Sequence, residues 1–380
     1  MSVSVEQSTP RSLTRLTGLL LLLCAASVGA QTVSTDYTVE TVTTGLEHPW
    51  SLAFLPDNRM LVTERAGRLR LINQDDVLIT EPVSGLPEDI YVDAQAGLKD
   101  LLLAPDFEDS GELHFSYACG TAEANTTCLA RATLEGRQLH NVEVIFRADP
   151  LREGSVHYGG RLARLPDDTL LLTLGDGFSY RNEAQNRQNH IGKIVRLNPD
   201  GSVPADNPFV DDPDTRDEIF TLGHRNPQGI LYDADTDRII AHEHGPRGGD
   251  ELNIIRAGEN YGWPLITTGV DYTGARITPF TELPGLTTPI LTWTPALAPS
   301  GITRYDGFLF PDWRGDYFIG GLAGQSVRRV RLHNGDATEE EVLFADRGDR
   351  FRDVRTGPDG ALYLLTDRAS GSVLRVVPDR

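Results

Sequence analysis

The segment Gly357-Pro358-Asp359-Gly360-Ala361-Leu362-Tyr363-Leu364-Leu365 shows a theme that the chain repeats: a Pro/Asp/Gly turn followed by a short apolar strand. Gly, Pro and Asp favour tight turns, and a short run rich in Leu, Val and Ile is typical of a strand buried on both faces. The theme recurs at five other places: Leu55-Pro56-Asp57 before strands 60–63 and 69–72, Ala104-Pro105-Asp106 before 113–117, Leu165-Pro166-Asp167 before 170–174, Tyr232-Asp233-Ala234 before 239–242, and Pro311-Asp312 before 317–320.

Six copies at this spacing predict an all-β chain folded as a six-bladed β-propeller with four-stranded antiparallel blades. A ring of blades must close, and we expect residues 37–42 to pair with the last strand, 373–377. The alternative is a β-sandwich followed by a second domain. It is disfavoured because no linker-like segment divides the chain.

The first residues have the pattern of a leader. Arg11 and Arg15 precede a short apolar run, 19–26, which ends in the small residues Val28-Gly29-Ala30. We interpret residues 1–30 as a signal peptide and 31–380 as the propeller domain, which predicts an exported protein, periplasmic or secreted. The alternative is a retained membrane anchor, although the run is shorter than the roughly 20 residues that span a bilayer.

The charge and the cysteine content indicate which partners and which disulfide to expect. The formal net charge is −20, which opposes nucleic acid or an anionic membrane surface as a partner. After loss of the leader with Cys24, the remaining cysteines are Cys119 and Cys128, at the facing ends of two strand-like runs. An even pair in an exported chain predicts a disulfide across a hairpin.

Four segments depart from the repeat and carry polar residues among glycines. They are Asp93-Ala94-Gln95-Ala96-Gly97-Leu98, the run 154–162 (GSVHYGGRL), the run 222–229 (LGHRNPQG), and the run 242–251 (HEHGPRGGDE), which is followed by 259–264 (ENYGWP).

Together these segments resemble the soluble glucose and aldose sugar dehydrogenases that use pyrroloquinoline quinone (PQQ). The resemblance extends from about Leu46 to the C-terminus, and its longest runs are GHRNPQG, EHGPRGGDELN with NYGWP, and DRFRDVRTGPDGALYLLTD at 349–367. It implies oxidation of an aldose at C1 to a lactone, with hydride transfer to PQQ and electrons passed on to a quinone or cytochrome. The preferred sugar and the oligomeric state stay open.

The resemblance assigns the catalytic base to His157. Oxidation of a sugar hydroxyl requires removal of a proton as hydride leaves the carbon, and a neutral imidazole suits that task. A lone histidine more often has a structural role. The flanking glycines allow a ligand to approach the backbone, and together with the family match they favour the catalytic interpretation.

PQQ is a tricarboxylate, and guanidinium groups pair well with carboxylates. Arg350 and Arg352 are two apart, which places both side chains on one face of a strand. The resemblance implies these cofactor-binding residues: Gln95, Arg225, Asn226, Arg350, Arg352 and, with a one-residue shift in the alignment, Trp293.

Calcium is the second implied cofactor. The backbone carbonyls of Gly245 and Pro246 would hold the ion beside the quinone, since carbonyl oxygens suit a hard cation. A second, structural calcium would use Glu251, the carbonyl of Tyr261 and Asp271. The rival interpretation makes His242 and His244 a zinc pair, but zinc takes three or four side-chain ligands and no third His or Cys lies nearby in the sequence.

The chain also departs from the family pattern. Ala323 stands where the family commonly has a lysine, and neither of the two lysines, Lys99 and Lys193, is near it in the sequence. A cofactor carboxylate is therefore expected to lose a charge partner, or Gln325 to replace it. Val156 and Gly177 replace an acid and a glutamine of the family.

Two other functions stay open at this point. A calcium-dependent lactonase shares the propeller fold, but it would hold calcium with side chains and has no task for the paired arginines. A non-catalytic propeller that binds a protein or a glycan is the other alternative, because one fold serves many functions.

Overall fold

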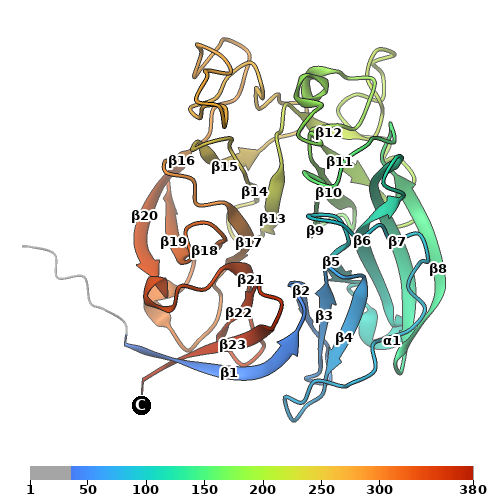
Figure 1. Cartoon of the computed structure of the whole chain (residues 1–380), viewed down its shortest axis with the longest axis vertical. Helices are drawn as coiled ribbons and strands as arrows, with labels where there is room; N and C mark the ends of the chain where they lie inside the picture. Colours follow the sequence, from blue (N-terminus) through green and yellow to red (C-terminus); the bar gives the residue numbers. More distant parts are fainter. Residues whose placement is uncertain (1–35, 380) are drawn as a thin grey trace, which may run out of the picture. The chain divides into compact units, whose positions relative to one another are not determined.

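The computed structural model describes residues 36–379, which form six antiparallel sheets arranged around a common centre (Figure 1). Each sheet is one blade, and blades 1 to 6 are numbered from the innermost strands β2, β5, β9, β13, β17 and β21. From the innermost strand outward, blade 1 consists of β2 (Pro49–Phe54), β3 (Met60–Glu64) and β4 (Arg68–Ile72), and blade 2 of β5 (Leu98–Leu103), β6 (Glu112–Gly120), β7 (Asn125–Glu135) and β8 (Gln138–Arg147). Blade 3 consists of β9 (Gly159–Arg164), β10 (Leu170–Leu174), β11 (Lys193–Leu197) and β12 (Ile219–Leu222), and blade 4 of β13 (Pro227–Asp233), β14 (Arg238–Glu243), β15 (Asp250–Ile255) and β16 (Leu291–Trp293). Blade 5 consists of β17 (Pro299–Arg304), β18 (Tyr317–Gly321), β19 (Val327–His333) and β20 (Asp336–Leu343), and blade 6 of β21 (Phe351–Thr356), β22 (Leu362–Thr366), β23 (Gly371–Pro378) and β1 (Tyr37–Leu46).

Helical structure in the described part is limited to short pieces. One α-helical turn, α1 (Phe107–Ser110), lies in blade 2, and three 3₁₀ turns occupy Arg181–Gln185, Pro311–Trp313 and Ala345–Arg347. Within residues 36–379 we find no helix long and apolar enough to cross a membrane.

The predicted six-bladed propeller is confirmed. In every blade the Pro/Asp theme joins the first strand to the second, so the six predicted strands are β3, β6, β10, β14, β18 and β22. Blade 1 has three regular strands, and isolated bridges from Leu69 to Val83 and from Ile72 to Leu78 continue its outer edge.

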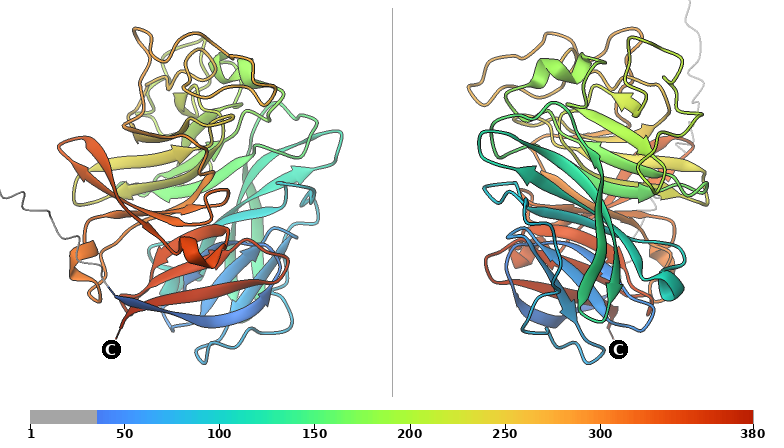
Figure 2. Two further views of the ribbon diagram at one scale, coloured as in Figure 1. Left: turned by 60° about the vertical axis from the view of Figure 1, so that its left-hand side comes forward. Right: turned by 90° about the vertical axis from the view of Figure 1, so that its right-hand side faces the viewer.

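The ring closes as expected from the sequence. β1 adds to blade 6 as its outermost strand and pairs antiparallel with β23, with Val39 opposite Val376. In Figure 2 the two ends of the chain's described part run side by side, blue β1 against red β23. The N-terminal strand thus completes the blade that the C-terminus builds, so the ring is held by a full antiparallel ladder.

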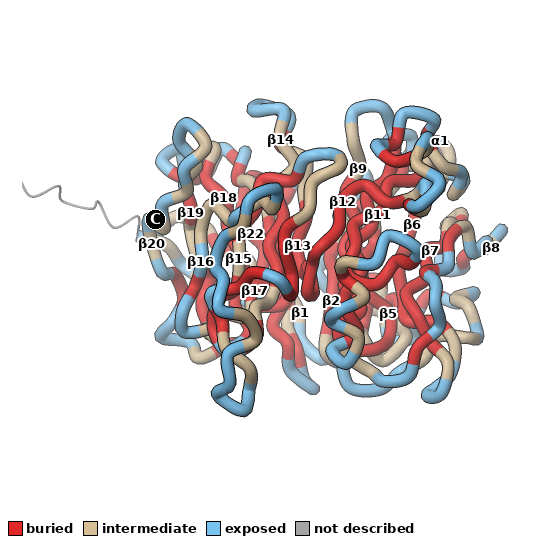
Figure 3. The backbone as a smooth tube through the Cα atoms, turned by 90° about the horizontal axis from the view of Figure 1, so that it is seen from above, coloured by how far each residue is buried: buried red, intermediate tan, exposed pale blue. Residues whose placement is uncertain are grey.

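The hydrophobic core is divided among the interfaces between neighbouring blades. Leu171 and Leu172 of β10 point to opposite faces of blade 3: Leu172 packs with Leu129 of blade 2, and Leu171 packs with Ile230 of blade 4. Successive residues of a strand face opposite sides of the sheet, so a strand buried on both faces needs apolar residues in a continuous run. Figure 3 shows this burial along the inner strands.

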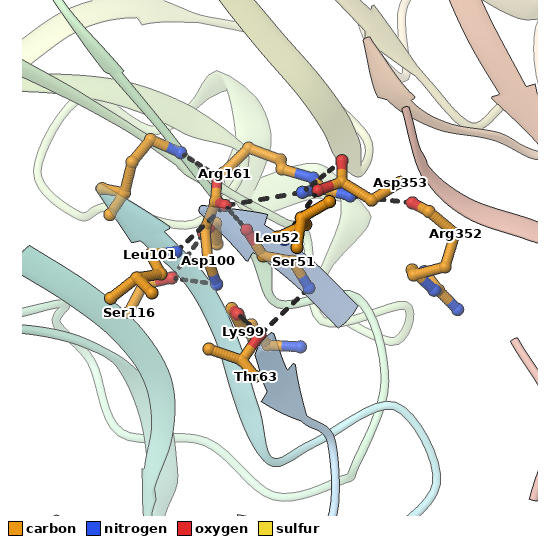
Figure 4. A network of polar contacts seen from close by, with 12 residues as sticks. Ser51, Leu52, Thr63, Lys99, Asp100, Leu101, Ser116, Arg161, Arg352 and Asp353 are labelled. Carbon is orange, nitrogen blue, oxygen red and sulfur yellow. Dashed lines mark hydrogen bonds and ion pairs between the residues drawn. The ribbon is translucent and has the colours of Figure 1, made fainter. Parts of the chain in front are cut away.

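A polar network links the innermost strands at the centre. Arg161 of β9, 2% exposed, donates Nε–H to the carbonyl of Gln228 at 2.8 Å and Nη2–H to the carbonyl of Arg352 at 3.0 Å. Its Nη1 forms ion pairs with Asp100 (3.5 Å) and Asp353 (3.2 Å), as Figure 4 shows.

The network reaches the two remaining blades through hydroxyl and backbone groups. Ser51 of β2 donates to Asp100 at 2.6 Å, and the N–H of Leu52 donates to Asp353 at 3.1 Å. Ser300 of β17 donates to the carbonyl of Arg352 at 2.8 Å. One set of buried polar groups therefore connects all six innermost strands.

The predicted disulfide is present. Cys119 of β6 and Cys128 of β7 are bonded, with Cα atoms 5.9 Å apart. The predicted signal peptide, residues 1–30, lies outside the described residues.

Replacing Arg161 with Met should destabilise the propeller strongly. Two buried carboxylates would lose an ion-pair partner, a change that typically costs about 3–5 kcal/mol. Urea unfolding measures the loss. The matched control is Arg137→Met, which removes an exposed ion pair with Glu81 and should change stability by less than about 1 kcal/mol. Equal stability of Arg161→Met and wild type would contradict the role of the network.

Candidate functional site

A cavity of about 230 Å³ opens at one end of the central channel. All six blades contribute to it, either from the start of an innermost strand or from the loop after a second strand, which lie at the same end of each blade. The lining residues are Trp50, Arg65, Gln95, Lys99, Tyr158, Gln228, His244, Ala298, Leu322, Arg350, Arg352 and Asp367.

The charge of this cavity is opposite to that of the chain. Four cationic side chains line it, and the one carboxylate among its lining residues is Asp367. Asp367 is already engaged: it accepts hydrogen bonds from Arg352 at 2.8 Å and from His48 at 2.8 Å. Burial alone would raise the pKa of Asp367, but the charge of Arg352 and the hydrogen bonds from His48 and Arg352 hold it well below its usual range. The cavity therefore suits a small molecule with several negative charges.

His157 lies beside the cavity in a constrained position. Its backbone is in the left-handed region (φ 55°), and its N–H donates to the Gln95 side chain at 2.9 Å. The side chain is 6% exposed, and its Nδ1 lies 2.7 Å from Oδ1 of Asp176. The exposed ring of Phe178 covers it edge-on at 5.3 Å.

Asp176 is itself held from two sides. Its Oδ2 accepts the indole N–H of Trp263 at 2.8 Å, and its Oδ1 accepts the backbone N–H of Phe178 at 2.8 Å. A carboxylate that is ionised only accepts hydrogen bonds, so Nδ1 of His157 is the protonated ring nitrogen. Nε2 keeps its lone pair, which is the arrangement of a general base.

Burial and pairing set the pKa values of these two groups. Burial lowers the pKa of His157 below its ordinary value, and Asp176 counteracts part of this effect. Burial would raise the pKa of Asp176, but the hydrogen bond from His157, the charge of Arg225 and the backbone N–H of Phe178 outweigh it and lower that pKa. A neutral imidazole beside an ionised carboxylate follows for neutral pH.

Arg225 and Asn226 connect His157 to blade 4. The backbone N–H of Arg225 donates to Glu243 at 2.5 Å, and its guanidinium donates to the His244 carbonyl at 3.2 Å. Asn226 accepts the N–H of Gly159 at 3.1 Å, two residues after His157. Both residues therefore lie close to His157, although neither lines the cavity itself.

The two arginines of β21 and its preceding loop meet at the cavity, together with Gln95. Arg350 donates to the Leu322 carbonyl at 3.1 Å and is half exposed, whereas Arg352 is buried. The structure thus brings Gln95, Arg350 and Arg352 into one site.

Trp293 lies elsewhere. It belongs to β16, the outermost strand of blade 4, and its indole N–H donates to Glu339 of blade 5 at 2.7 Å. The ring is packed in the core between blades 4 and 5. The structure does not bring Trp293 to the cavity, because an edge strand is the part of a blade farthest from the channel.

The turn after β14 gathers backbone oxygens. Gly245 donates its N–H to Asp250 at 2.7 Å, while within residues 36–379 the carbonyl oxygens of Gly245 and Pro246 accept no hydrogen bond. A Cβ at Gly245 would lie 2.2 Å from the Gly249 carbonyl oxygen, so only glycine fits. Free carbonyl oxygens in a tight turn suit a hard cation such as calcium.

Glu251 faces a second acid. It lies opposite Glu243 in the β14–β15 ladder, and burial together with the Glu243 charge raises the pKa of Glu251 to about 8. Its hydrogen-bond partner Asn253 has a buried amide oxygen without a partner of its own. A cation near Glu251 would relieve both features.

The other two expected ligands of a structural calcium are placed as follows. Tyr261 is buried with its ring stacked on His224 at 4.8 Å, and Asp271 forms an ion pair with Arg181 at 3.4 Å. Among the described residues, no group of three or more His, Cys, Asp or Glu side chains converges as a metal site, so a cation here would rely on carbonyl oxygens. His242 and His244 have different surroundings. His244 Nε2 lies 2.9 Å from the Pro299 carbonyl, whereas both ring nitrogens of His242 are buried without a hydrogen-bond partner among residues 36–379.

Sequence reasoning missed several residues of the site. Asp176 lies between two glycines directly after a strand-like run, and this position could have indicated a site residue. Trp263 lies in the NYGWP run. Lys99 was dismissed because it is far from Ala323 in the sequence, yet it lines the same cavity from blade 2. The cavity thus contains a lysine even though Ala323 stands at the position where the family commonly has one.

A larger, more open hollow of about 590 Å³ lies elsewhere, between blades 4 and 5, and is lined by residues that include Asp233, Arg304 and Arg355. None of the predicted site residues lines it, so we place the functional site at the smaller cavity.

Comparison with known proteins gives a consistent result. The family model "Glucose / Sorbosone dehydrogenase" matches residues 46–375. The chain is 39% identical over 370 residues to the Aldose sugar dehydrogenase YliI of Escherichia coli (strain K12), covering 95% of this chain and 98% of that protein.

Solved structures agree with this assignment. A crystal structure of a glucose dehydrogenase superposes with a TM-score of 0.87 at 43% identity, covering 90% of this chain and 100% of that chain. The PQQ-bound form of an aldose sugar dehydrogenase from Streptomyces coelicolor superposes with a TM-score of 0.72 at 27% identity, covering 90% and 99%. The resemblance inferred from the sequence motifs is thus confirmed: this chain belongs to the glucose/sorbosone dehydrogenase family of sugar-oxidising β-propellers.

Proposed function

We propose that the chain is an exported aldose sugar dehydrogenase that uses PQQ and calcium and oxidises the C1 hydroxyl to a lactone. The observation that carries the proposal is the buried His157–Asp176 pair beside a cation-rich cavity in a strongly acidic protein. The family supplies the reaction class, and the PQQ-bound relative supports the choice of cofactor.

The cavity fits a tricarboxylate. Arg65, Lys99, Arg350 and Arg352 line it, and only Arg352 is in hydrogen-bond contact with the single lining carboxylate. Arg225 adds a further positive charge near His157. Cationic side chains in a partly buried cavity would pair strongly with the cofactor carboxylates.

Calcium fits the turn at Gly245 and Pro246, where two carbonyl oxygens accept no hydrogen bond from residues 36–379, and a second ion fits beside Glu251. Tyr261 and Asp271 are the proposed companions of Glu251. When bound, PQQ supplies an o-quinone that accepts hydride, and the adjacent calcium polarises it.

His157 would carry the proton chemistry. Its Nε2 takes the proton of the C1 hydroxyl as hydride leaves C1, and the imidazolium that forms is stabilised by Asp176 on the opposite ring nitrogen. Burial under Phe178 limits water around the ring. Trp263 and the N–H of Phe178 keep Asp176 aligned during this transfer.

The compartment is proposed from the disulfide, and the electron acceptor from the chemistry. The Cys119–Cys128 disulfide is expected in an oxidising compartment, which supports export to the periplasm or the medium. A quinone or cytochrome is proposed as the electron acceptor, because the reduced cofactor must be reoxidised. A lactonase is not favoured, since the cationic lining has no task in lactone hydrolysis.

The direct test is dye reduction by the purified apo protein with PQQ, calcium and glucose. We expect activity only when both cofactors are added. The variant His157→Gln should retain PQQ binding and lose roughly 10²–10⁴-fold in kcat, since it removes the base. The control His140→Gln replaces an exposed histidine and should keep full activity. Near-wild-type kcat for His157→Gln would exclude it as the base.

Asp176→Asn should slow turnover and change the pH profile. An amide accepts hydrogen bonds only through its oxygen, so the asparagine cannot accept from both Trp263 and His157 as the two carboxylate oxygens do. The imidazole then loses its fixed tautomer, and we expect roughly a 10²-fold loss of kcat. In wild type, burial lowers the pKa of His157 from its ordinary value of 6.5, so kcat/KM should rise with pH through a midpoint below 6.5. Asp176 raises this pKa, so the variant's midpoint should move to lower pH. Asp168→Asn, at the far end of the β9–β10 hairpin, is the control. A midpoint that does not move would show that Asp176 has no electrostatic effect on the base.

Calcium should raise the Tm of the apo protein, because a ligand that binds only the native state stabilises it by about 3 kcal/mol at a concentration 100-fold above its Kd. Glu251→Gln should reduce this calcium-dependent shift, whereas Glu81→Gln, at an exposed glutamate, should leave it intact. Differential scanning fluorimetry with and without chelator measures both. An undiminished shift in Glu251→Gln would remove that residue from the calcium site.

A further inference from the structure

Lys99 occupies an unusual position. It is the second residue of β5, 3% exposed, and it lines the central cavity. Its Nζ donates to the Gln95 carbonyl at 2.8 Å and lies over the rings of Trp50 (5.4 Å) and Tyr158 (5.0 Å). Only one of its three N–H groups is used by a hydrogen bond within the described residues.

No carboxylate neutralises this ammonium group. Within residues 36–379, Lys99 takes part in no ion pair, and the nearby acids are engaged by others: Asp367 by Arg352 and Asp100 by Arg161. Burial, and the charges of Arg352 and other arginines around it, lower the pKa of Lys99 well below its ordinary value. Aromatic faces offset part of the cost of a buried cation, but an anion would offset more.

The second lysine shows what a structural lysine looks like in this chain. Lys193 is fully buried, and its Nζ donates to three carbonyls, those of Glu183, Ala184 and Ile191, at 2.7–3.0 Å. All three of its N–H donors are satisfied. Lys99 has one partner and an open side toward the cavity, so its position is not explained by packing alone.

The surrounding backbone makes room for the Lys99 side chain. A Cβ at Gly160 would lie 2.4 Å from Cδ of Lys99, so the aliphatic stem passes over the glycine at the start of β9. This path holds the ammonium between Trp50 and Tyr158, at the wall of the cavity.

We propose that Lys99 is a cofactor-binding residue whose ammonium group pairs with a carboxylate of bound PQQ. It supplies from blade 2 a lysine charge that Ala323 does not supply from blade 5. This inference rests on the proposed function, and it assigns to the cofactor a residue of this chain that lies outside the motifs of the resemblance.

The test is a titration of the cofactor-free full chain with PQQ in the presence of calcium. Binding is monitored through quenching of tryptophan fluorescence, since Trp50 lines the cavity. Lys99→Met keeps the length of the stem and removes the charge. It should raise the Kd by roughly 10–100-fold, the effect of losing one charge-assisted contact. The Tm of the cofactor-free variant should equal or exceed that of wild type, because an unpaired buried cation is removed.

Lys193→Met is the matched control. It should lower the Tm, since three carbonyls lose their donor, and leave the Kd for PQQ of the folded protein unchanged. A Lys99→Met Kd within about twofold of wild type, or a weakened Kd accompanied by a lower Tm, would overturn the role of Lys99 while the proposed function stands. Absence of PQQ binding by wild type would instead overturn the proposed function and the assignment of Lys99 with it.

Discussion

The buried guanidinium of Arg161 is the interaction on which the centre of this propeller depends. Six innermost strands converge on the channel, and their facing groups are polar rather than apolar. Arg161 joins β9 directly to β5, β13 and β21, and Ser51 and Ser300 extend the network to β2 and β17. A buried charge is tolerated only when it is paired, so the two aspartates and the arginine fix each other and the strands that carry them. The interfaces between blades are mainly apolar, with single polar contacts such as that of Trp293 with Glu339 between blades 4 and 5.

The same network builds the wall of the site. Arg161 and Ser300 both bind the Arg352 carbonyl, so the backbone of β21 is held while the Arg352 side chain reaches the cavity and meets Asp367. The Trp50 ring contacts both cations, with the Arg161 guanidinium 3.9 Å and the Lys99 ammonium 5.4 Å from its centroid. The cation-rich end of the channel is thus a continuation of the ion-pair network, with the difference that its cations outnumber the available carboxylates. That surplus, in a chain with a net charge of −20, is the reason to expect an anionic cofactor.

Much of the fold could be predicted because each blade repeats a local signal. A Pro/Asp turn before a run such as Leu170–Leu174 marks the second strand. Because this strand is buried on both faces, its residues are apolar in a continuous run that is easily recognised in the sequence. His157, Gln95, Arg350 and Arg352 were found through motifs, and the structure brings them together. Asp176 and Lys99 were missed because their roles arise from contacts between strands and blades far apart in the sequence. Trp293 was assigned by a shifted alignment, and only the strand order places it at a blade edge.

The central claim is that the cavity at the end of the channel holds the cofactor, with His157 facing the reacting carbon. A crystal structure of the chain grown with PQQ and calcium tests it most directly. The account predicts cofactor density in the cavity lined by Lys99, Arg350 and Arg352, with its open face toward Nε2 of His157 and calcium at the carbonyls of Gly245 and Pro246. Cofactor density in the larger hollow near Asp233 and Arg304, with the channel cavity empty, would contradict it.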